Sequence, residues 1–122
     1  MKKIMLVLCL MSLMLSAATD KYRVVWQESP ESEAKVIWNQ ISGIDAQIHY
    51  GKLDHGQDAA FYANVKSPDT ALDYKGMDNR TVNLTNLEAD TNYYFVIQDS
   101  DSTSERYYFR TAPAIKAPFK FI

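Results

Sequence analysis

The residue types that could bind a metal gather in two polar segments. Asp54, His55 and Asp58 place three possible ligands in one segment. Their spacing matches no metal site that we can justify, so we expect a solvated loop. Asp99 and Asp101 resemble the start of a calcium loop. The Gly and the distal Glu that calcium geometry requires are missing there, so we expect a polar hairpin tip instead.

The remaining chemistry-bearing residues do not assemble into a catalytic set. The chain has one Cys and two His, and His49 is predicted to point outward from a strand as a surface residue. Asn79-Arg80-Thr81 and Asn83-Leu84-Thr85 are glycosylation sequons only in a eukaryotic secretory route. We therefore assign no catalytic, cofactor-binding or metal-binding residue in this chain.

The first 18 residues have the pattern of a secretory signal peptide. Lys2 and Lys3 precede an apolar run over residues 4–15, and Ser16-Ala17-Ala18 supplies the small residues that a signal peptidase reads. The run is shorter than the roughly 20 apolar residues that span a bilayer. Cys9 follows Leu8 and lies too early for a lipoprotein site. We expect cleavage after Ala18 and a secreted or periplasmic protein of a bacterium, with no membrane attachment afterwards.

Cleavage there also changes the charge and the redox chemistry of the chain. It removes the only Cys, so the mature domain must fold without a disulfide. The mature chain keeps 11 basic residues against 15 acidic ones, a net charge of −4. Nucleic acids and anionic membranes attract basic surfaces, so neither is an expected partner.

Short alternating apolar runs separated by turn residues predict an all-β sandwich. In the second run Ala34, Val36 and Trp38 share one face, and Trp38 is expected at the centre of the core. In the third, Ala46, Ile48 and Tyr50 are expected inward and Gln47 and His49 outward. The expected strands, seven or eight in number and antiparallel, cover residues 22–27, 34–39, 46–50, 60–65, 71–74, 81–84, 93–98 and 106–110.

A tyrosine corner is predicted where the seventh of these strands begins. Leu87 is followed by a short polar bend, and Tyr93 stands six residues later at the entry to a strand. In such a corner the Tyr hydroxyl bonds back to the backbone a few residues upstream and fixes the crossing between sheets. The Leu87, Thr91 and Tyr93 frame resembles the fibronectin type III pattern, with Ala89 in place of Pro and Asp90 in place of Gly.

Four motifs in one order resemble the N-terminal domain of the purple acid phosphatases. They are Trp38; Ile48-His49-Tyr50-Gly51; Leu87-Glu88-Ala89-Asp90-Thr91-Asn92-Tyr93-Tyr94-Phe95; and Phe109-Arg110-Thr111-Ala112-Pro113. The resemblance implies a fibronectin type III or immunoglobulin-like sandwich over residues 19–113.

The resemblance also implies a larger parent protein. The family hydrolyses phosphate monoesters with a dinuclear metal centre, whose Asp, Asn, His and Tyr ligands belong to the catalytic domain. Residues 114–122 would be the linker and the start of the first catalytic strand, and the metal-binding Gly-Asp pair would follow. We expect an accessory domain, inactive alone, whose partner is a metallophosphoesterase catalytic domain in the same polypeptide, here truncated or fragmented. The alternative for these residues is an extra strand on the sandwich edge.

Exposed tyrosines on neighbouring strands predict a contact surface. Tyr94 alternates with the inward Tyr93, and Tyr107 or Tyr108 does the same on the next strand. Such a patch fits a catalytic domain or a second protomer, with a carbohydrate as another occupant. Simple cross-strand aromatic pairing explains it equally well. A stand-alone secreted module that binds protein or carbohydrate is therefore the alternative function.

Overall fold

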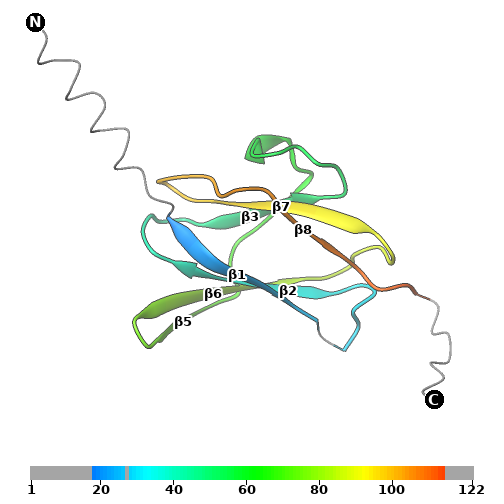
Figure 1. The fold of residues 1–122 in the computed structure, drawn as a ribbon, viewed down its shortest axis with the longest axis horizontal. Helices are drawn as coiled ribbons and strands as arrows, with labels where there is room; N and C mark the ends of the chain where they lie inside the picture. The colour runs from blue at the N-terminus through cyan, green and yellow to red at the C-terminus, as the bar shows by residue number, and fades with distance from the viewer. Residues whose placement is uncertain (1–17, 27, 115–122) are drawn as a thin grey trace, which may run out of the picture.

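The computed structural model describes residues 18–26 and 28–114, which form an all-β sandwich (Figure 1). Of the predicted signal peptide, residues 1–18, all but Ala18 lie outside the described residues, and so does the predicted linker, residues 114–122, apart from Ala114. Within the described part, no helix has the length and apolar character needed to cross a membrane. The strands are β1 (Thr19–Val25), β2 (Ala34–Gln40), β3 (Gln47–Gly51), β4 (Asn64–Lys66), β5 (Thr70–Tyr74), β6 (Met77–Leu84), β7 (Asn92–Gln98) and β8 (Tyr107–Arg110), with a 3-10 helix η1 (Ala59–Phe61).

The strands form two four-stranded antiparallel sheets that lie face to face (Figure 1). The first sheet has the order β1-β2-β6-β5 and the second the order β4-β3-β7-β8. The chain crosses from one sheet to the other between β2 and β3, between β4 and β5, and between β6 and β7. The eight strands and the sandwich confirm the predicted fold class.

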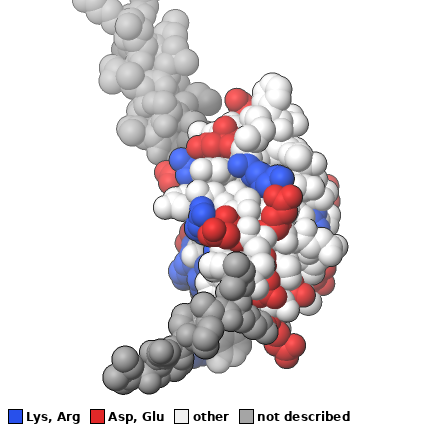
Figure 2. All heavy atoms as spheres, turned by 90° about the vertical axis from the view of Figure 1, so that its right-hand side faces the viewer, with Lys and Arg blue, Asp and Glu red and all other residues white. Residues whose placement is uncertain are grey.

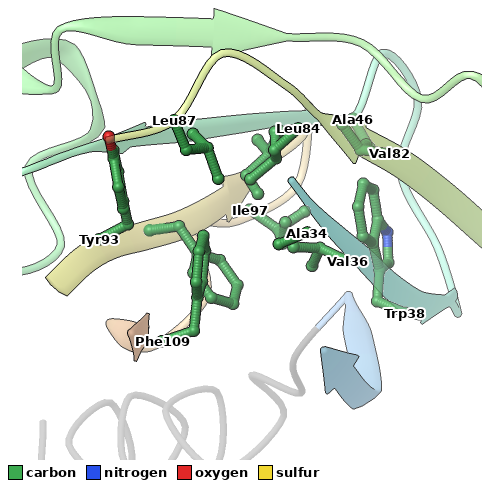
Figure 3. Packing of buried hydrophobic residues seen from close by; sticks show 12 residues of the cluster. Ala34, Val36, Trp38, Ala46, Val82, Leu84, Leu87, Tyr93, Ile97 and Phe109 are labelled. Carbon is green, nitrogen blue, oxygen red and sulfur yellow. The ribbon is translucent and has the colours of Figure 1, made fainter. Parts of the chain in front are cut away.

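The core fills the space between the sheets mainly with side chains from β2, β3, β6, β7 and β8 (Figure 3). Along β2 the side chains of Ala34, Val36, Trp38 and Gln40 are buried in alternation, as the period of two predicts. Trp38 is fully buried, and its Nε1 donates a hydrogen bond to Gln40 Oε1 at 2.7 Å. A buried indole N–H needs such a partner. Gln40 therefore allows Trp38, the largest side chain of the core, to be buried away from water.

One predicted strand is only partly correct. Residues 60–65 are predicted as a strand, whereas residues 59–61 form η1 and β4 begins at Asn64. Ala59 and Tyr62 are buried, while Phe61 is exposed. A single turn of 3-10 helix places Ala59 and Tyr62 on the outer face of the second sheet, which an extended strand would not cover.

The predicted exposure of His49 is wrong for the same reason. His49 does point away from the main core, but only 9% of its surface is exposed. It pairs across the sheet with Val96, which packs with Ala59 and Tyr62 in a second, smaller apolar cluster. The segment around η1 therefore buries a face that the strand pattern predicts to be in water.

Candidate functional site

The segment with three possible metal ligands is held by its own hydrogen bonds and one ion pair. Asp54 Oδ1 accepts a hydrogen bond from the backbone N–H of Gly56 at 2.9 Å and lies 3.3 Å from the Arg106 Nε. The His55 ring packs edge-on against Tyr62, with 5.3 Å between ring centroids. Among the described residues no group of three or more His, Cys, Asp or Glu is placed to hold a metal ion.

The second acidic segment is a polar hairpin tip, as the sequence predicts. Asp99 Oδ1 accepts hydrogen bonds from the backbone N–H groups of Asp101 and Ser102, at 2.8 and 2.9 Å. Its Oδ2 accepts one from Gln40 Nε2 at 2.8 Å. Asp99 therefore closes the turn and links it to the Gln40 side chain that supports Trp38.

The tyrosine corner is confirmed. The Tyr93 hydroxyl accepts a hydrogen bond from the backbone N–H of Glu88 at 2.7 Å, and Tyr93 itself is buried. Its ring stacks on Phe109, with 5.7 Å between centroids and 16° between planes. In Figure 3 the hydroxyl points away from β7 towards the segment that carries Leu87.

Thr111 ties the corner to the last strand, a link that the sequence motifs did not reveal. Its buried hydroxyl donates to the Glu88 carbonyl at 2.6 Å and accepts from the Thr91 N–H at 3.0 Å. Glu88 is thus held at its N–H by Tyr93 and at its carbonyl by Thr111. We call this group the exit cluster; it comprises Leu87, Glu88, Thr91, Tyr93, Phe109 and Thr111.

Backbone hydrogen bonds hold Ala112, the residue that follows the exit cluster. The Ala112 N–H donates to the Pro30 carbonyl at 3.0 Å, and the Ala112 carbonyl accepts from the Asp90 N–H at 2.9 Å. The β1–β2 loop and the β6–β7 connection therefore hold the backbone two residues before the last described residue, Ala114. Because these bonds are backbone bonds, the position of Ala112 is set by the fold and not by a flexible side chain.

The aromatic surface contains Tyr108 and not Tyr107. Tyr94 and Tyr108 are cross-strand neighbours with 6.0 Å between ring centroids, and Tyr108 is 61% exposed. The Arg106 guanidinium lies over both rings, at 5.3 and 5.8 Å from their centroids. Tyr107 points to the opposite face and packs on Tyr22 at 4.3 Å.

Two features of this end of the molecule escaped sequence reasoning. Trp26 lies just beyond β1, packs edge-on against Phe109 at 6.0 Å and is 45% exposed. The sequence places it in a strand, and nothing local distinguishes it from the buried Trp38. The other feature is a hollow of about 140 Å³ lined by Gly51, Lys52, Leu53, His55 and Ala63.

Charges near the exit occur in opposite-sign pairs. Arg110 Nη2 lies 2.9 Å from Asp90 Oδ1, and Lys52 Nζ lies 2.8 Å from Glu88 Oε2. Figure 2 shows the end where the chain leaves, with basic side chains beside acidic ones and broad areas that are neither. The Glu88 carboxylate raises the pKa of Lys52 by a hydrogen bond and by its charge, so the lysine stays protonated.

Comparison with known proteins gives one family and one fold. The family described as "Purple acid Phosphatase, N-terminal domain" matches residues 19–111. No curated protein matches. A solved structure from a computer-based redesign of a β-sandwich protein has a TM-score of 0.50 and 17% identity, covering 83% of this chain and 100% of its own. At that identity the similarity shows the sandwich fold alone.

Proposed function

The chain belongs to the family of purple acid phosphatase N-terminal domains, and from this premise we propose that it is the accessory domain of an exported purple-acid-phosphatase-like metallophosphoesterase. The parent activity is phosphate monoester hydrolysis at a dinuclear metal centre. That centre belongs to a separate catalytic domain, which the accessory domain contacts and whose active-site rim it shapes. The family match over residues 19–111 is the observation that carries this proposal.

The donor groups of this domain do not fit a dinuclear metal centre. Two bridged metals need several carboxylate, amide or imidazole ligands within a few ångströms of one point. Here the carboxylates of Asp54 and Asp99 already accept hydrogen bonds from backbone N–H groups. His49 lies under η1, where burial lowers its pKa. No catalytic step is therefore assigned to a residue of this chain.

The backbone bonds of Ala112 support a role as a covalently attached companion. An accessory domain can shape its neighbour only if the junction between them has a defined direction, because a freely rotating linker averages out weak contacts. The bonds from Ala112 to Pro30 and Asp90 hold the chain in place up to two residues before the last described residue, which favours such a junction. They lie directly after the residues that the family match covers.

An activity assay and a binding measurement test the proposal. The purified chain, supplied with iron, zinc or manganese, should not hydrolyse an aryl phosphate. A metallophosphoesterase catalytic domain from the same organism, expressed separately, should bind the chain and gain thermal stability. Phosphatase activity of the chain alone that survives repurification would contradict the proposal, as would a failure of the two domains to associate.

A stand-alone binding module is the second candidate function. The exposed Tyr108, its neighbour Tyr94 and the Arg106 guanidinium over both rings favour it, because such groups also stack on sugar rings. A glycan array probed with the purified chain tests it. Specific binding that Tyr108→Ala abolishes would favour the module, and no binding to any glycan would count against it.

A further inference from the structure

β5 is an edge strand whose second side has no partner strand among the described residues. It pairs with β6 alone, in a regular antiparallel register from Thr70 to Tyr74. All five of its residues are exposed, and the exposed fractions of Leu72 and Tyr74 are 63% and 56%. Figure 1 shows the strand at the margin of the first sheet. An edge of this kind offers a row of backbone N–H and C=O groups to another strand.

The other three edge strands of the described sandwich are interrupted or short. β1 has an irregular register between Asp20 and Arg23, where Lys21 has a positive φ of 54°. β4 has three residues and β8 has four. A bulge and a short edge strand are both features that prevent edge-to-edge pairing. β5 has neither feature, so it is the edge best suited to accept a further strand.

We propose that β5 pairs antiparallel with β5 of a second copy of this chain, about a two-fold axis at Leu72. The pairing joins the first sheets of the two copies into one continuous sheet. Leu72 then lies opposite its own copy, and Thr70 lies opposite the second copy's Tyr74. This contact depends on the edge of the first sheet alone, so it stands whether or not the chain is an accessory domain.

Charge selects this register over its neighbours. A centre at Leu72 pairs all five residues of each strand and places Asp69 opposite the second copy's Lys75. A centre at Ala71 places Asp73 opposite Asp69, and a centre at Asp73 places that residue opposite its own copy. Like charges directly opposite each other destabilise a strand pair, whereas opposite charges stabilise it. Centres further along the strand pair fewer of its residues.

The charged residues at the two ends of β5 differ in what they already contact. Asp69 is fixed beside β6, because its Oδ2 accepts a hydrogen bond from the Asn83 N–H at 2.6 Å and lies 3.3 Å from Lys66 Nζ. Lys75 Nζ lies 5.3 Å from the centroid of the Tyr74 ring, and no ion pair within the described part of the chain includes it. The second copy therefore supplies the acidic partner that Lys75 lacks.

The side chains on one face of β5 add apolar contacts to this pairing. Thr70, Leu72 and Tyr74 share that face, since alternate residues of a strand point the same way. The pairing brings the two leucines together and places each Tyr74 ring beside a Thr70 methyl group, a kind of cross-strand contact that stabilises sheets. Five residues from each strand make a small interface, so the dimer is weak and depends on protein concentration. Because the two-fold pairing uses both β5 edges, association ends at two chains.

A single-cysteine scan tests the register. Cys9 is the only cysteine of the chain, so Cys9→Ser gives a background without thiols. In that background Leu72→Cys should form a disulfide-linked dimer under mild oxidation, because facing Cα atoms of an antiparallel pair are about 4.5–5.5 Å apart, within the reach of a disulfide. Thr70→Cys is the matched control on the same face. Its two copies are offset by four residues, about 13 Å along the strand, so it should stay monomeric.

A mixture of two variants tests the same register from its ends. Thr70→Cys and Tyr74→Cys should each stay monomeric alone, because neither residue faces its own copy. Mixed in equal amounts and oxidised, they should form a disulfide-linked dimer, because residue 70 of one copy faces residue 74 of the other.

Sedimentation equilibrium measures the contact without a covalent bond. The unmodified chain should show a monomer–dimer equilibrium. Leu72→Asp sets two like charges opposite each other, and Lys75→Glu sets an acid opposite Asp69, so each should weaken dimerisation by about tenfold or more. Lys35→Glu makes the same change of charge in β2 and should have a much smaller effect. Circular dichroism of Leu72→Asp should match the unmodified chain, because residue 72 is exposed.

Each result supports the pairing or overturns it. Cross-linking of Leu72→Cys but not of Thr70→Cys would support the register, and equal cross-linking of the two would overturn it. A chain that stays monomeric at every concentration and does not cross-link would overturn the dimer. A dimer that neither Leu72→Asp nor Lys75→Glu weakens would assign self-association to another surface. None of these results bears on the accessory role, which the assay with a catalytic domain tests separately.

Discussion

Removing the hydroxyl of Tyr93 isolates the contribution of the tyrosine corner. Tyr93→Phe keeps the ring on Phe109 and deletes only the acceptor of the Glu88 N–H bond. A buried donor left without a partner costs about 1–3 kcal/mol. Glu88 is exposed, so water can reach its amide in part, and we expect a loss of about 1–2 kcal/mol. For a domain of this size that lowers the midpoint of thermal unfolding by roughly 4–16 °C.

Urea and thermal unfolding of Tyr93→Phe beside a matched variant provide the assay. Tyr108→Phe also deletes a phenol hydroxyl, but Tyr108 is exposed and makes no hydrogen bond among the described residues. Its stability should stay within about 0.5 kcal/mol of the unmodified chain. Equal midpoints for both variants would refute the assignment of the corner as a stabilising bond.

A double substitution shows whether the corner and the last strand act together. Tyr93 and Thr111 hold the N–H and the carbonyl of the same residue, Glu88. The costs of Tyr93→Phe and Thr111→Val should therefore not add, with a coupling energy of about 0.5 kcal/mol or more. Strict additivity would mean that the exit cluster is two independent contacts.

Four further predictions concern the core and the tip. Burial lowers the pKa of His49 below its ordinary 6.5, against the hydrogen bond to Ala59. Between these two pKa values the unfolded chain therefore binds more protons than the folded chain. The free energy of unfolding should fall as the pH drops from 6.5 towards the folded-state pKa, by at most about 1.4 kcal/mol per pH unit. Thermal melts of His49→Gln at the same pH values should lack this slope. Trp38→Phe leaves Gln40 Oε1 without its donor and should cost roughly 1–3 kcal/mol in urea unfolding. Asp99→Ala removes the carboxylate that accepts hydrogen bonds from the Asp101 and Ser102 N–H groups, and it should cost roughly 1–3 kcal/mol by the same assay. Calcium should leave the unfolding midpoint of the unmodified chain unchanged. A rise in that midpoint would contradict the tip as a closed hydrogen-bonded turn.

Local sequence patterns were sufficient to predict the sandwich and its tyrosine corner. Alternation along β2 identifies Trp38 as a core residue because a strand sends successive side chains to opposite faces. Tyr93 and Glu88 lie five residues apart, so the corner is a local device that a short motif can encode. The polar tip at Asp99 is equally local, since its carboxylate bonds to the two following turn residues.

What the sequence could not specify depends on segments that meet only in the folded chain. Alternation correctly sends His49 away from the main core, but the burial of that outer face depends on η1, which the pattern of β3 does not encode. In the same way Tyr107 and Tyr108 are adjacent and chemically identical, and only their register against β7 decides which one faces the solvent.

The sequence by itself determined the fold class, the family and the corner, because these depend on short-range spacing and on the order of motifs. The tertiary structure decided that Thr111 joins Tyr93 at Glu88 and that Trp26 stays half-exposed beside the chain exit. The Thr111–Glu88 and Trp26–Phe109 contacts join residues more than 20 positions apart, and their formation depends on how the two sheets pack at one end of the sandwich.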